Sequence, residues 1–296
     1  MEMNKLGKVI VRIPATSANL GPGVNSIGIA LKLYYTVIVE EPTSEWRVNH
    51  ALGEQIPHDE NNLIVKTILK INPDIKPHQL TVMSDIPVMH GLGSSTTATV
   101  AGIKIANALG KMNLSLDEQI NLGSRMEKHS NNVASAILGD LTISTFDGNL
   151  ATTVKTTIPK NIKALVSIKN SSNQSKIIAD NEMISYKDAV NASSFSNVFI
   201  AAIMSNEWSK ATSMMELDHF YKYISSDDGY NLNLIRNIAH RVGVHSTYLS
   251  GFGSTVVTLG TESELNQIRD ALSDQDFKGS LRIINIDRDG AQVRGE

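Results

Sequence analysis

The chain has 296 residues, enough for two domains of typical size, and 41% of them are hydrophobic, which suffices for a buried core. A net charge of −3 gives no basic footprint for nucleic acid, and the absence of cysteine removes disulfides, thiol nucleophiles and thiolate metal sites. The longest apolar run, Val198–Met204, is far below the roughly 20 residues that a membrane span needs. We therefore expect a soluble, cytoplasmic protein that binds neither membranes nor nucleic acid.

In the first half of the chain, apolar residues alternate in predicted strands and recur every three or four positions in predicted helices. The strands are Val9–Ile13, Ser26–Val39, Leu80–Met83 and one near Leu141–Thr145, and the helices are Asn62–Ile71, Thr96–Leu109 and Leu116–Lys128. Residues 14–23 contain two prolines, two glycines, an asparagine and small residues, so we expect a structured loop there rather than a helix or strand.

A domain boundary is expected near residues 150–160, where polar residues surround Pro159. Beyond it, the pattern predicts strands at Ile162–Ile168 and Leu281–Ile286, a strand–glycine turn–strand at Tyr248–Leu259, and helices at Tyr186–Met204, Asn206–Met215, Asn231–Val242 and Glu262–Leu272. Strands and helices mix without strict βαβ alternation, which favours an α+β fold over a doubly wound sheet.

A second glycine-rich segment, residues 86–98, is the strongest chemical signal in the sequence. Its two glycines precede two serines, and the segment runs directly into a predicted helix. Glycines let backbone N–H groups approach an anion, and a helix N-terminus carries about half a positive charge with unpaired N–H donors. The segment therefore predicts a phosphate site, where Ser94 or Ser95 offers a hydroxyl to phosphate or Mg²⁺.

The same two serines allow a simpler interpretation, in which Ser94 and Ser95 cap the helix and the glycines form a tight turn. The segment lacks the Gly-Lys-Ser/Thr of a Walker A loop, so it is not a phosphate loop of that kind. Taken alone, these residues leave both interpretations open.

Three separated segments together resemble the motifs of the galactokinase, homoserine kinase, mevalonate kinase and phosphomevalonate kinase (GHMP) family. Residues 87–98 resemble its ATP-phosphate motif, with threonines where two alanines are usual, residues 14–28 its first motif, and Ser250–Val256 its third. The Asn-Leu-Gly-Pro-Gly of residues 19–23 and the segment Glu127–Gly139 are similar to the homoserine kinases of this family. The resemblance covers nearly the whole chain, with the motifs in the family's order.

The resemblance implies a two-domain α+β fold, with residues 1–155 like ribosomal protein S5 domain 2 and residues 156–296 ferredoxin-like. It implies that ATP lies between the domains and that Mg²⁺ is the cofactor. The implied reaction is ATP-dependent phosphorylation of the hydroxyl of L-homoserine to O-phospho-L-homoserine, in threonine biosynthesis. Because dimers are the commonest oligomers and this family often forms them, a homodimer is the assembly that the resemblance suggests, although the sequence does not fix it.

Position by position, the resemblance implies three sets of site residues. The ATP set is Asn62 at the adenine, Pro87, Gly91, Leu92, Gly93, Ser94 and Ser95. The magnesium set is Glu127, Ser94 and Ser95. The set that faces the alcohol substrate is Asn19, Asn25, His129 and Asn132.

Phosphoryl transfer requires mainly alignment and neutralisation of charge, which a magnesium carboxylate and a helix N-terminus can supply. The homoserine kinases that this chain resembles lack an Asp base, so the candidate catalytic residues are Asn132, which positions the hydroxyl, and His129. His129 is the candidate that titrates near neutral pH. A structural, hydrogen-bonded histidine is the alternative interpretation of His129.

Several residues depart from the homoserine kinase pattern on the side of the amino-acid substrate. Two Asp positions of the pattern hold Asn25 and Asn131, and two Arg positions fall at Ile177 and Ser225. An amide brings no charge to an ammonium group, and charge-assisted hydrogen bonds are roughly twice as strong as neutral ones. The departures predict relaxed or altered specificity, whereas the phosphate loop and the magnesium carboxylate are retained.

Three hypotheses follow from these residues. The first is a homoserine kinase with an unusual pocket, and it predicts that L-homoserine stimulates ADP release. The second is a kinase for a different, less charged small alcohol. The third is a catalytically weak or inactive nucleotide-binding homologue, because a fold can persist after its chemistry is lost.

Overall fold

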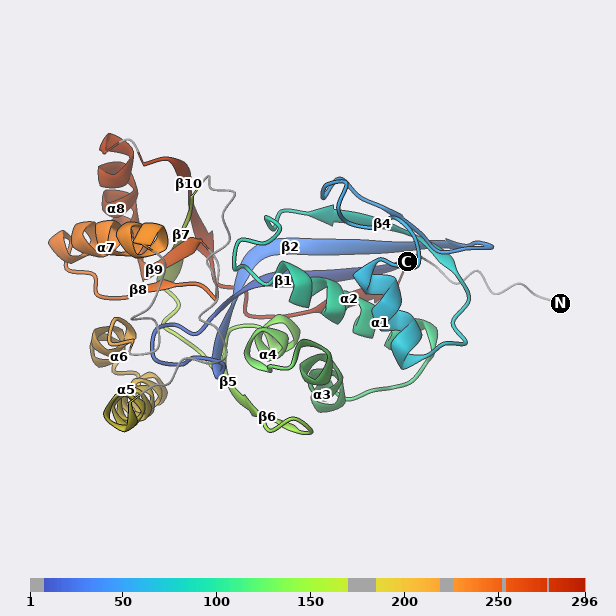
Figure 1. Cartoon of the computed structure of the whole chain (residues 1–296), viewed down its shortest axis with the longest axis horizontal. Coiled ribbons are helices and arrows are strands. Elements are labelled where there is room, and N and C mark those ends of the chain that lie inside the picture. The colour runs from blue at the N-terminus through green and yellow to red at the C-terminus, as the bar shows by residue number, and fades with distance from the viewer. Residues whose placement is uncertain (1–7, 170–184, 219–225, 252–253, 276, 296) are drawn as a thin grey trace.

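The computed structural model describes residues 8–169, 185–218, 226–251, 254–275 and 277–295, with only the backbone described for residues 226–230. The described chain forms a seven-stranded and a four-stranded sheet, which lie side by side along the long axis of the molecule (Figure 1). Among the described strands, every pair is antiparallel except β3 with β4. The mixed, largely antiparallel arrangement confirms the expected α+β class.

The seven-stranded sheet has the order β11-β1-β2-β4-β3, and β5 joins β2 and carries β6. Its strands are β1 (Val9–Ala18), β2 (Ile27–Pro42), β3 (Arg47–Asn49), β4 (His78–Ser84), β5 (Leu141–Phe146), β6 (Ala151–Thr156) and β11 (Gln292–Gly295). The long strand β2 pairs with two strands along the edge opposite β1. Residues 27–29 pair with β5, and residues 35–42 pair with β4.

Strand β1 is longer than the sequence indicated, and the expectation of a loop at residues 14–23 is wrong for residues 14–18. The register of β1 against β2 shifts between Pro14 and Ala15, after which residues 15–18 pair with residues 28–31. Proline cannot donate to a strand ladder, and an irregularity of this kind accommodates it. The small residues that suggested a loop are instead closely covered, because Thr16 and Ser17 are fully buried.

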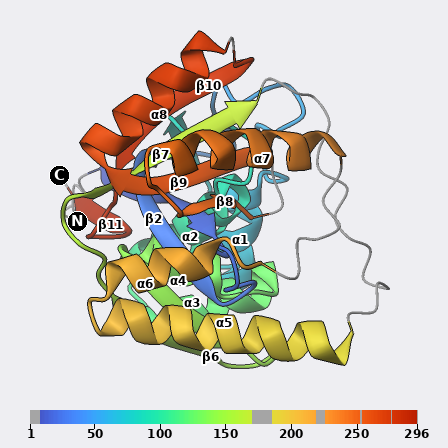
Figure 2. The ribbon, with the colours of Figure 1, turned by 90° about the vertical axis from the view of Figure 1, so that its left-hand side faces the viewer.

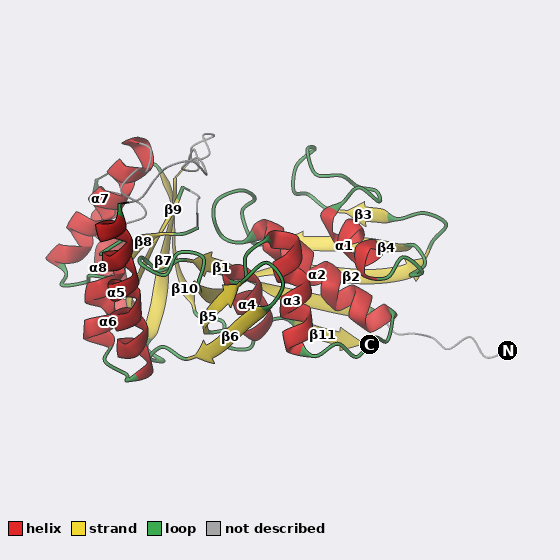
Figure 3. Cartoon of the chain, turned by 60° about the horizontal axis from the view of Figure 1, so that its bottom comes forward, coloured by secondary structure: helices red, strands yellow, loops and turns green. Residues whose placement is uncertain are grey.

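Four helices pack against the seven-stranded sheet, and Figure 3 shows them in front of it. They are α1 (Leu63–Ile71), α2 (Ser94–Leu109), α3 (Leu116–Glu127) and α4 (Asn131–Leu138). Every residue of α2 from Thr96 to Ala106 is buried, because the helix contacts α1, α3, α4 and the sheet at once. This central position fixes the N-terminus of α2 relative to β1.

The four-stranded sheet has the order β10-β7-β9-β8. Its strands are β7 (Ile162–Lys169), β8 (Thr247–Leu249), β9 (Thr255–Thr261) and β10 (Gly279–Asn285). Helices α7 (Ser226–Arg241) and α8 (Glu262–Asp274) share a core with Leu165 and Val256 of this sheet. Helices α5 (Tyr186–Met204) and α6 (Trp208–Met215) lie beyond β8, and their Phe199 and Met215 join the larger core that continues into the first sheet (Figure 2).

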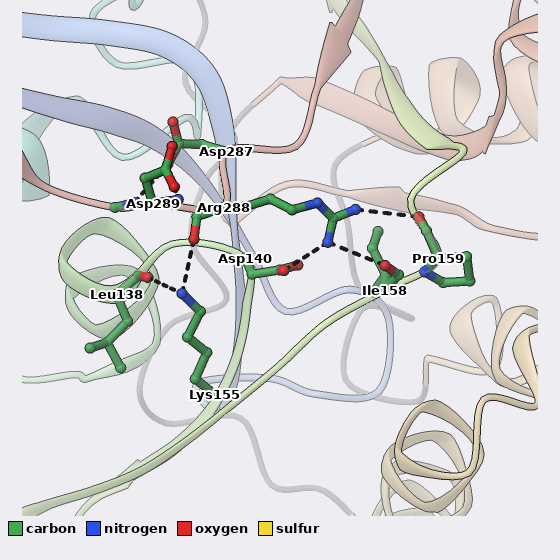
Figure 4. A network of polar contacts seen from close by, with 9 residues as sticks. Leu138, Asp140, Lys155, Ile158, Pro159, Asp287, Arg288 and Asp289 are labelled. Carbon is green, nitrogen blue, oxygen red and sulfur yellow. Dashed lines mark hydrogen bonds and ion pairs between the residues drawn. The ribbon is translucent and has the colours of Figure 1, made fainter.

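The chain crosses from the first sheet to the second between β6 and β7, and it crosses back after β10. One group of polar contacts joins these two connecting segments (Figure 4). Arg288 donates from Nη1 to Oδ2 of Asp140 at 2.7 Å and to the carbonyl of Ile158 at 3.2 Å. Lys155 donates to the carbonyls of Leu138 and Arg288. Asp140 is buried and Arg288 only partly so, and loss of Arg288 would leave the buried carboxylate without its charged partner, so these contacts join the connecting segments between the two sheets.

The remaining predicted strands and helices are confirmed, with ends that differ by a few residues. Four elements were not foreseen: the short strands β3, β6 and β11, and helix α4. Strand β11 pairs antiparallel with β1, with Gly295 opposite Val9, so residues from near the end of the sequence complete the first sheet. No helix in the described ranges is long and apolar enough to cross a membrane.

Candidate active site

The glycine-rich segment leads into an N-terminus of α2 that no side chain caps. The N-cap residue is Gly93, with a left-handed φ of 71°, and Ser94 and Ser95 already lie inside the helix. The interpretation of these serines as helix caps is therefore wrong. By contrast, a side chain caps each of α1, α3, α5 and α8. The N–H donors in the first turn of α2 remain available to an anion.

Gly93 packs so closely on β1 that a larger residue would collide with it. A Cβ atom at Gly93 would lie 2.1 Å from Oγ1 of Thr16. The backbone N–H of Thr16 donates to the carbonyl of Leu92 at 3.2 Å. Thr16 therefore fixes both the loop and the first turn of α2 against the sheet.

The strand–turn–strand of the second sheet holds the same loop from the other side. Ser250 donates from Oγ to the carbonyl of Gly91 at 2.7 Å, and Thr255 donates from Oγ1 to the carbonyl of His90 at 2.5 Å. Two consecutive carbonyls of the glycine-rich loop are thus bound by side chains from the end of β8 and the start of β9. The loop is positioned jointly by the two sheets.

Ser250 is also the end of a chain of hydroxyl groups. Ser17 Oγ lies 2.7 Å from Ser250 Oγ and 2.9 Å from the hydroxyl of Tyr248. Each hydroxyl has one hydrogen to give, and Ser250 gives its own to Gly91. Ser17 must therefore donate to Ser250, and Tyr248 to Ser17. Complete burial raises the pKa of Tyr248, which keeps the proton that this donation requires.

Glu127, the last residue of α3, is oriented by two hydroxyl groups of α2. Thr99 donates from Oγ1 to Oε1 of Glu127 at 2.6 Å, and Thr96 donates from Oγ1 to Oε2 at 3.1 Å. Residues three apart share a helix face, so both threonines reach one carboxylate. Each carboxylate oxygen keeps a further lone pair, and Mg²⁺ takes oxygen ligands. The donor set at Glu127 therefore fits a magnesium ion.

Asn132 lies in the first turn of α4, and His129 lies in the short segment between Glu127 and that helix. Asn132 accepts a hydrogen bond at Oδ1 from Oγ1 of Thr16 at 2.9 Å. Since its oxygen is held by Thr16, the amide group Nδ2 is the end that can contact a substrate. The Nδ1 atom of His129 is buried, and no atom of the described residues bonds it. That atom gives no support to a structural, hydrogen-bonded histidine.

Asn19 and Asn25 of the first motif form a polar group with Asn131 of α4. Oδ1 of Asn19 accepts from the backbone N–H of Asn25 at 3.1 Å and from Nδ2 of Asn131 at 3.3 Å. Asn19 and Asn131 are buried, whereas Asn25 is exposed and has a left-handed φ of 56°. The side chain of Asn19 thus holds its own loop in place. The structure brings these three residues together.

A cavity of about 470 Å³ lies at the glycine-rich loop. The predicted ATP residues that line it are Asn62, Gly91, Gly93, Ser94 and Ser95. Glu127, His129 and Asn132 line the same cavity, so the predicted metal and catalytic residues share it with the loop. Asn19, Asn25, Pro87 and Leu92 are not among its lining residues, and the Leu92 side chain is buried in the core.

Asn62 has a local structural task as well as a place in the cavity. Its Oδ1 accepts from the backbone N–H of Ile64 at 3.0 Å, which caps α1, and its Nδ2 donates to the carbonyl of Pro57 at 2.7 Å. The capping bond explains why α1 begins at Leu63. Asn62 also joins the segment that contains Pro57 to the cavity wall.

Two groups of residues complete the comparison with the sequence. Ile177 and Ser225, at the Arg positions of the family pattern, lie outside the described residues. Thr16, Thr96 and Thr99 were not assigned a role from the sequence, although the first two lie in the quoted motifs. The threonine pair at positions i and i+3 was the available signal, but only the packing of α3 on α2 shows which carboxylate it meets.

The described fold is that of a GHMP kinase. Residues 62–148, from α1 to just beyond β5, match the family described as the GHMP kinases N terminal domain. The chain is 40% identical over 284 residues to the homoserine kinase of Enterococcus faecalis, covering 96% of this chain and 99% of that protein. It is 37% identical to the homoserine kinase of Leuconostoc mesenteroides, covering 96% and 98%.

Solved structures agree with these relatives. A protein of Listeria monocytogenes assigned as a homoserine kinase has 35% identity and a TM-score of 0.87, covering 97% of this chain and 99% of that one. A homoserine kinase from Cytophaga hutchinsonii, at 18% identity, has the same fold with a TM-score of 0.81 and 99% of each chain covered. The chain belongs to the homoserine kinase family of the GHMP kinases.

Proposed function

We propose that this protein transfers the γ-phosphoryl group of ATP to the hydroxyl of L-homoserine, giving O-phospho-L-homoserine and ADP, a step in threonine biosynthesis. One observation carries the proposal: the uncapped N-terminus of α2 and Glu127 border one cavity in a chain 37–40% identical to homoserine kinases. These relatives favour homoserine over a different small alcohol, and they favour an enzyme over a non-catalytic homologue.

The described residues divide the binding of the nucleotide and the metal. The backbone N–H groups of Gly91–Ser95 would hold the phosphates, and Asn62 would lie at the adenine. Glu127, with the hydroxyl of Ser94 or Ser95, would hold Mg²⁺, which supplies positive charge against the oxygens of the transferred group. Thr96 and Thr99 would keep the carboxylate oriented while it binds the ion.

The acceptor hydroxyl requires a group that orients its oxygen and a destination for its proton. Asn132 would donate from Nδ2 to the hydroxyl oxygen, which aims a lone pair at the γ-phosphorus. The new oxygen–phosphorus bond forms as the bond between the γ-phosphorus and the β–γ bridging oxygen breaks. His129, in the same cavity, is the group that would accept the released proton.

The finer architecture belongs to the same proposal. Residues 1–155 would form a domain like ribosomal protein S5 domain 2 and residues 156–296 a ferredoxin-like domain, with β11 returning to the first sheet. A homodimer and a cytoplasmic location are also proposed. The dimer is supported by the family's habit of assembly and by the general frequency of dimers.

The experiment is a coupled ADP-release assay with Mg-ATP, comparing L-homoserine with no acceptor and with a panel of small alcohols that lack the ammonium or the carboxylate. Glu127→Gln serves as the inactive control, because an amide at this position brings no charge to the metal. Identification of O-phospho-L-homoserine by mass separates transfer from ATP hydrolysis.

Stimulation by L-homoserine at least tenfold above the no-acceptor rate, and its loss in Glu127→Gln, are the expected results. A larger stimulation by an uncharged alcohol would replace homoserine with that acceptor. ATP binding without transfer to any acceptor would mean that the fold has been kept and the chemistry lost.

A further inference from the structure

A second group of side chains able to bind a cation lies outside the cavity, where α6, α7 and β8 meet. Among the described residues, Glu216, His240 and His245 place their ligand atoms within 4.8 Å of one another. Glu216 directly follows α6, His240 lies in the last turn of α7, and His245 precedes β8, which lies between the two helices in Figures 1 and 2. We propose that these three side chains bind one divalent transition-metal ion of the Zn²⁺ class.

The geometry of the three side chains is close to that of a bound ion. Nε2 of His240 lies 2.6 Å from Oε2 of Glu216, and the ring centroids of His240 and His245 are 4.4 Å apart. Zn²⁺ binds imidazole nitrogen and carboxylate oxygen at about 2.0–2.2 Å, which places neighbouring ligand atoms roughly 3.3 Å apart in a tetrahedron. Both histidines are exposed, so small side-chain rotations can close the difference, and water can occupy the fourth position.

Glu216 is held in place by contacts that a metal ligand requires. Its Oε1 accepts from the backbone N–H of Thr247 at 3.1 Å, and Arg236 donates from Nε to the carbonyl of the same residue at 3.1 Å. Outer contacts of this kind fix the direction of a ligand and strengthen binding. Nε of Arg236 lies 3.9 Å from Oε2 of Glu216, and its positive charge opposes a cation there.

The backbone supplies a second, independent preference for a cation. Glu216 is the C-cap of α6 and His240 belongs to the last turn of α7, so two helix C-termini meet at the cluster. A helix C-terminus carries about half a negative charge. The ligand chemistry then selects the ion, because imidazole suits Zn²⁺, Cu²⁺ and Ni²⁺, whereas Mg²⁺ prefers oxygen ligands such as those at Glu127.

An ion at this place would tie together three elements that support the first motif. The carbonyl of Met215, one residue before Glu216, packs against Gly21, where a Cβ atom would lie 1.8 Å from it. Thr247, which binds Glu216, precedes Tyr248 and its chain of hydroxyl groups to the glycine-rich loop. The metal therefore links α6, α7 and β8 outside the cavity, and its binding should be measurable as an increase in the stability of the folded protein.

The test is a zinc titration of the untagged full-length protein by isothermal titration calorimetry, in excess Mg²⁺ and without nucleotide, since phosphates chelate zinc. His240→Ala and His245→Ala each remove one ligand, and His245→Ala keeps the hydrogen bond between His240 and Glu216. The matched control is His50→Ala, which removes an imidazole from another close histidine pair of the described residues, His50 and His58, whose ring centroids are 3.9 Å apart. Co²⁺ absorption reports the coordination directly.

We expect one zinc ion per chain in the natural protein and in His50→Ala. Each ligand variant should lose at least about tenfold in affinity, because even the loss of an outer contact costs 10–100-fold. Zinc at 100 times its Kd should raise Tm by roughly 4–5 °C in the natural protein. Failure of the natural protein to bind zinc, equal affinity in His245→Ala, or loss of binding in His50→Ala would each overturn the assignment.

Discussion

The contact between Gly93 and Thr16 makes a quantitative prediction about the glycine-rich loop. Gly93 has a left-handed φ of 71°, and a Cβ atom there would lie 2.1 Å from Oγ1 of the buried Thr16. Gly93→Ala therefore introduces two separate costs, one from the backbone and one from the collision. Gly243→Ala is the matched control, because Gly243 has a left-handed φ of 84° but nothing within 4 Å of the added atom.

The two variants share the backbone cost and differ in the collision. A left-handed conformation costs a residue with a side chain about 1–2 kcal/mol. Overpacking a buried contact costs typically 1–3 kcal/mol more. Gly93→Ala should therefore lower the free energy of unfolding by about 2–5 kcal/mol, and Gly243→Ala by about 1–2 kcal/mol. Since the loop must shift away from β1, Gly93→Ala should also raise the KM for ATP, and Gly243→Ala should leave it unchanged.

Urea unfolding and steady-state kinetics measure both effects, and a double variant tests the cause. Thr16→Ala removes the atom that the new Cβ meets, at the expense of the bond to Asn132. The combined Gly93→Ala, Thr16→Ala protein should lose less stability than the sum of the two single variants, by about 1 kcal/mol or more. Strictly additive losses, or a Gly93→Ala protein no less stable than Gly243→Ala, would refute this account of the loop.

Three further predictions concern single buried groups. Thr99→Val removes the hydroxyl that donates to Glu127, so the Mg²⁺ concentration for half-maximal rate should rise about tenfold or more. Thr99→Ser keeps the hydroxyl and should restore the original requirement. An unchanged magnesium requirement in Thr99→Val would exclude a positioning role for Thr99. Asn131→Asp replaces the amide that donates to Asn19 by a buried acceptor, so the free energy of unfolding measured in urea should fall by about 1–3 kcal/mol at neutral pH. An unchanged free energy of unfolding would show that the site tolerates the Asp of the family pattern. Burial lowers the pKa of Lys104 to about 8. Above that pH the unfolded chain binds more protons than the folded one, so the destabilisation caused by burying this lysine shrinks as pH rises from about 8 to its ordinary pKa. Lys104→Met should therefore raise Tm at pH 7 and raise it less at pH 9.5, and an advantage equal at both values would contradict the shift.

The elements that the sequence predicted well are those whose local signals agree with their tertiary role. Asn62 marks the start of α1 because its side chain caps the helix, and the alternation from Ile27 to Val39 marks β2 because one of its faces is more deeply buried than the other. The predicted loop at residues 14–18 was wrong because the small side chains there reflect close packing of a strand under other elements rather than a turn. Short strands such as β3 carry too few residues for a period to appear.

The candidate site divides in a similar way. The glycine-rich loop and Glu127 were recognisable because their chemistry lies in consecutive residues that resemble a family motif. Thr16 and Thr99 bind Asn132 and Glu127, which are distant from them in the sequence. Thr16 meets Asn132 only once α4 packs on β1, and Thr99 meets Glu127 only once α3 packs on α2. Asn19, which the resemblance places at the substrate, also uses its amide oxygen to hold its own loop, a contact that no local sequence pattern indicates.

The pairing of β11 with β1 has a consequence for how the protein is made. A ribosome completes β1 and β2 long before it reaches residues 292–295, so the nascent first sheet has an open edge at Val9–Arg12 for most of synthesis. Unpaired backbone groups along an apolar strand are a template for pairing with another chain. Residues 292–295 therefore cover an edge that could otherwise pair with another chain, and deleting them should reduce soluble yield during expression even though they do not line the cavity.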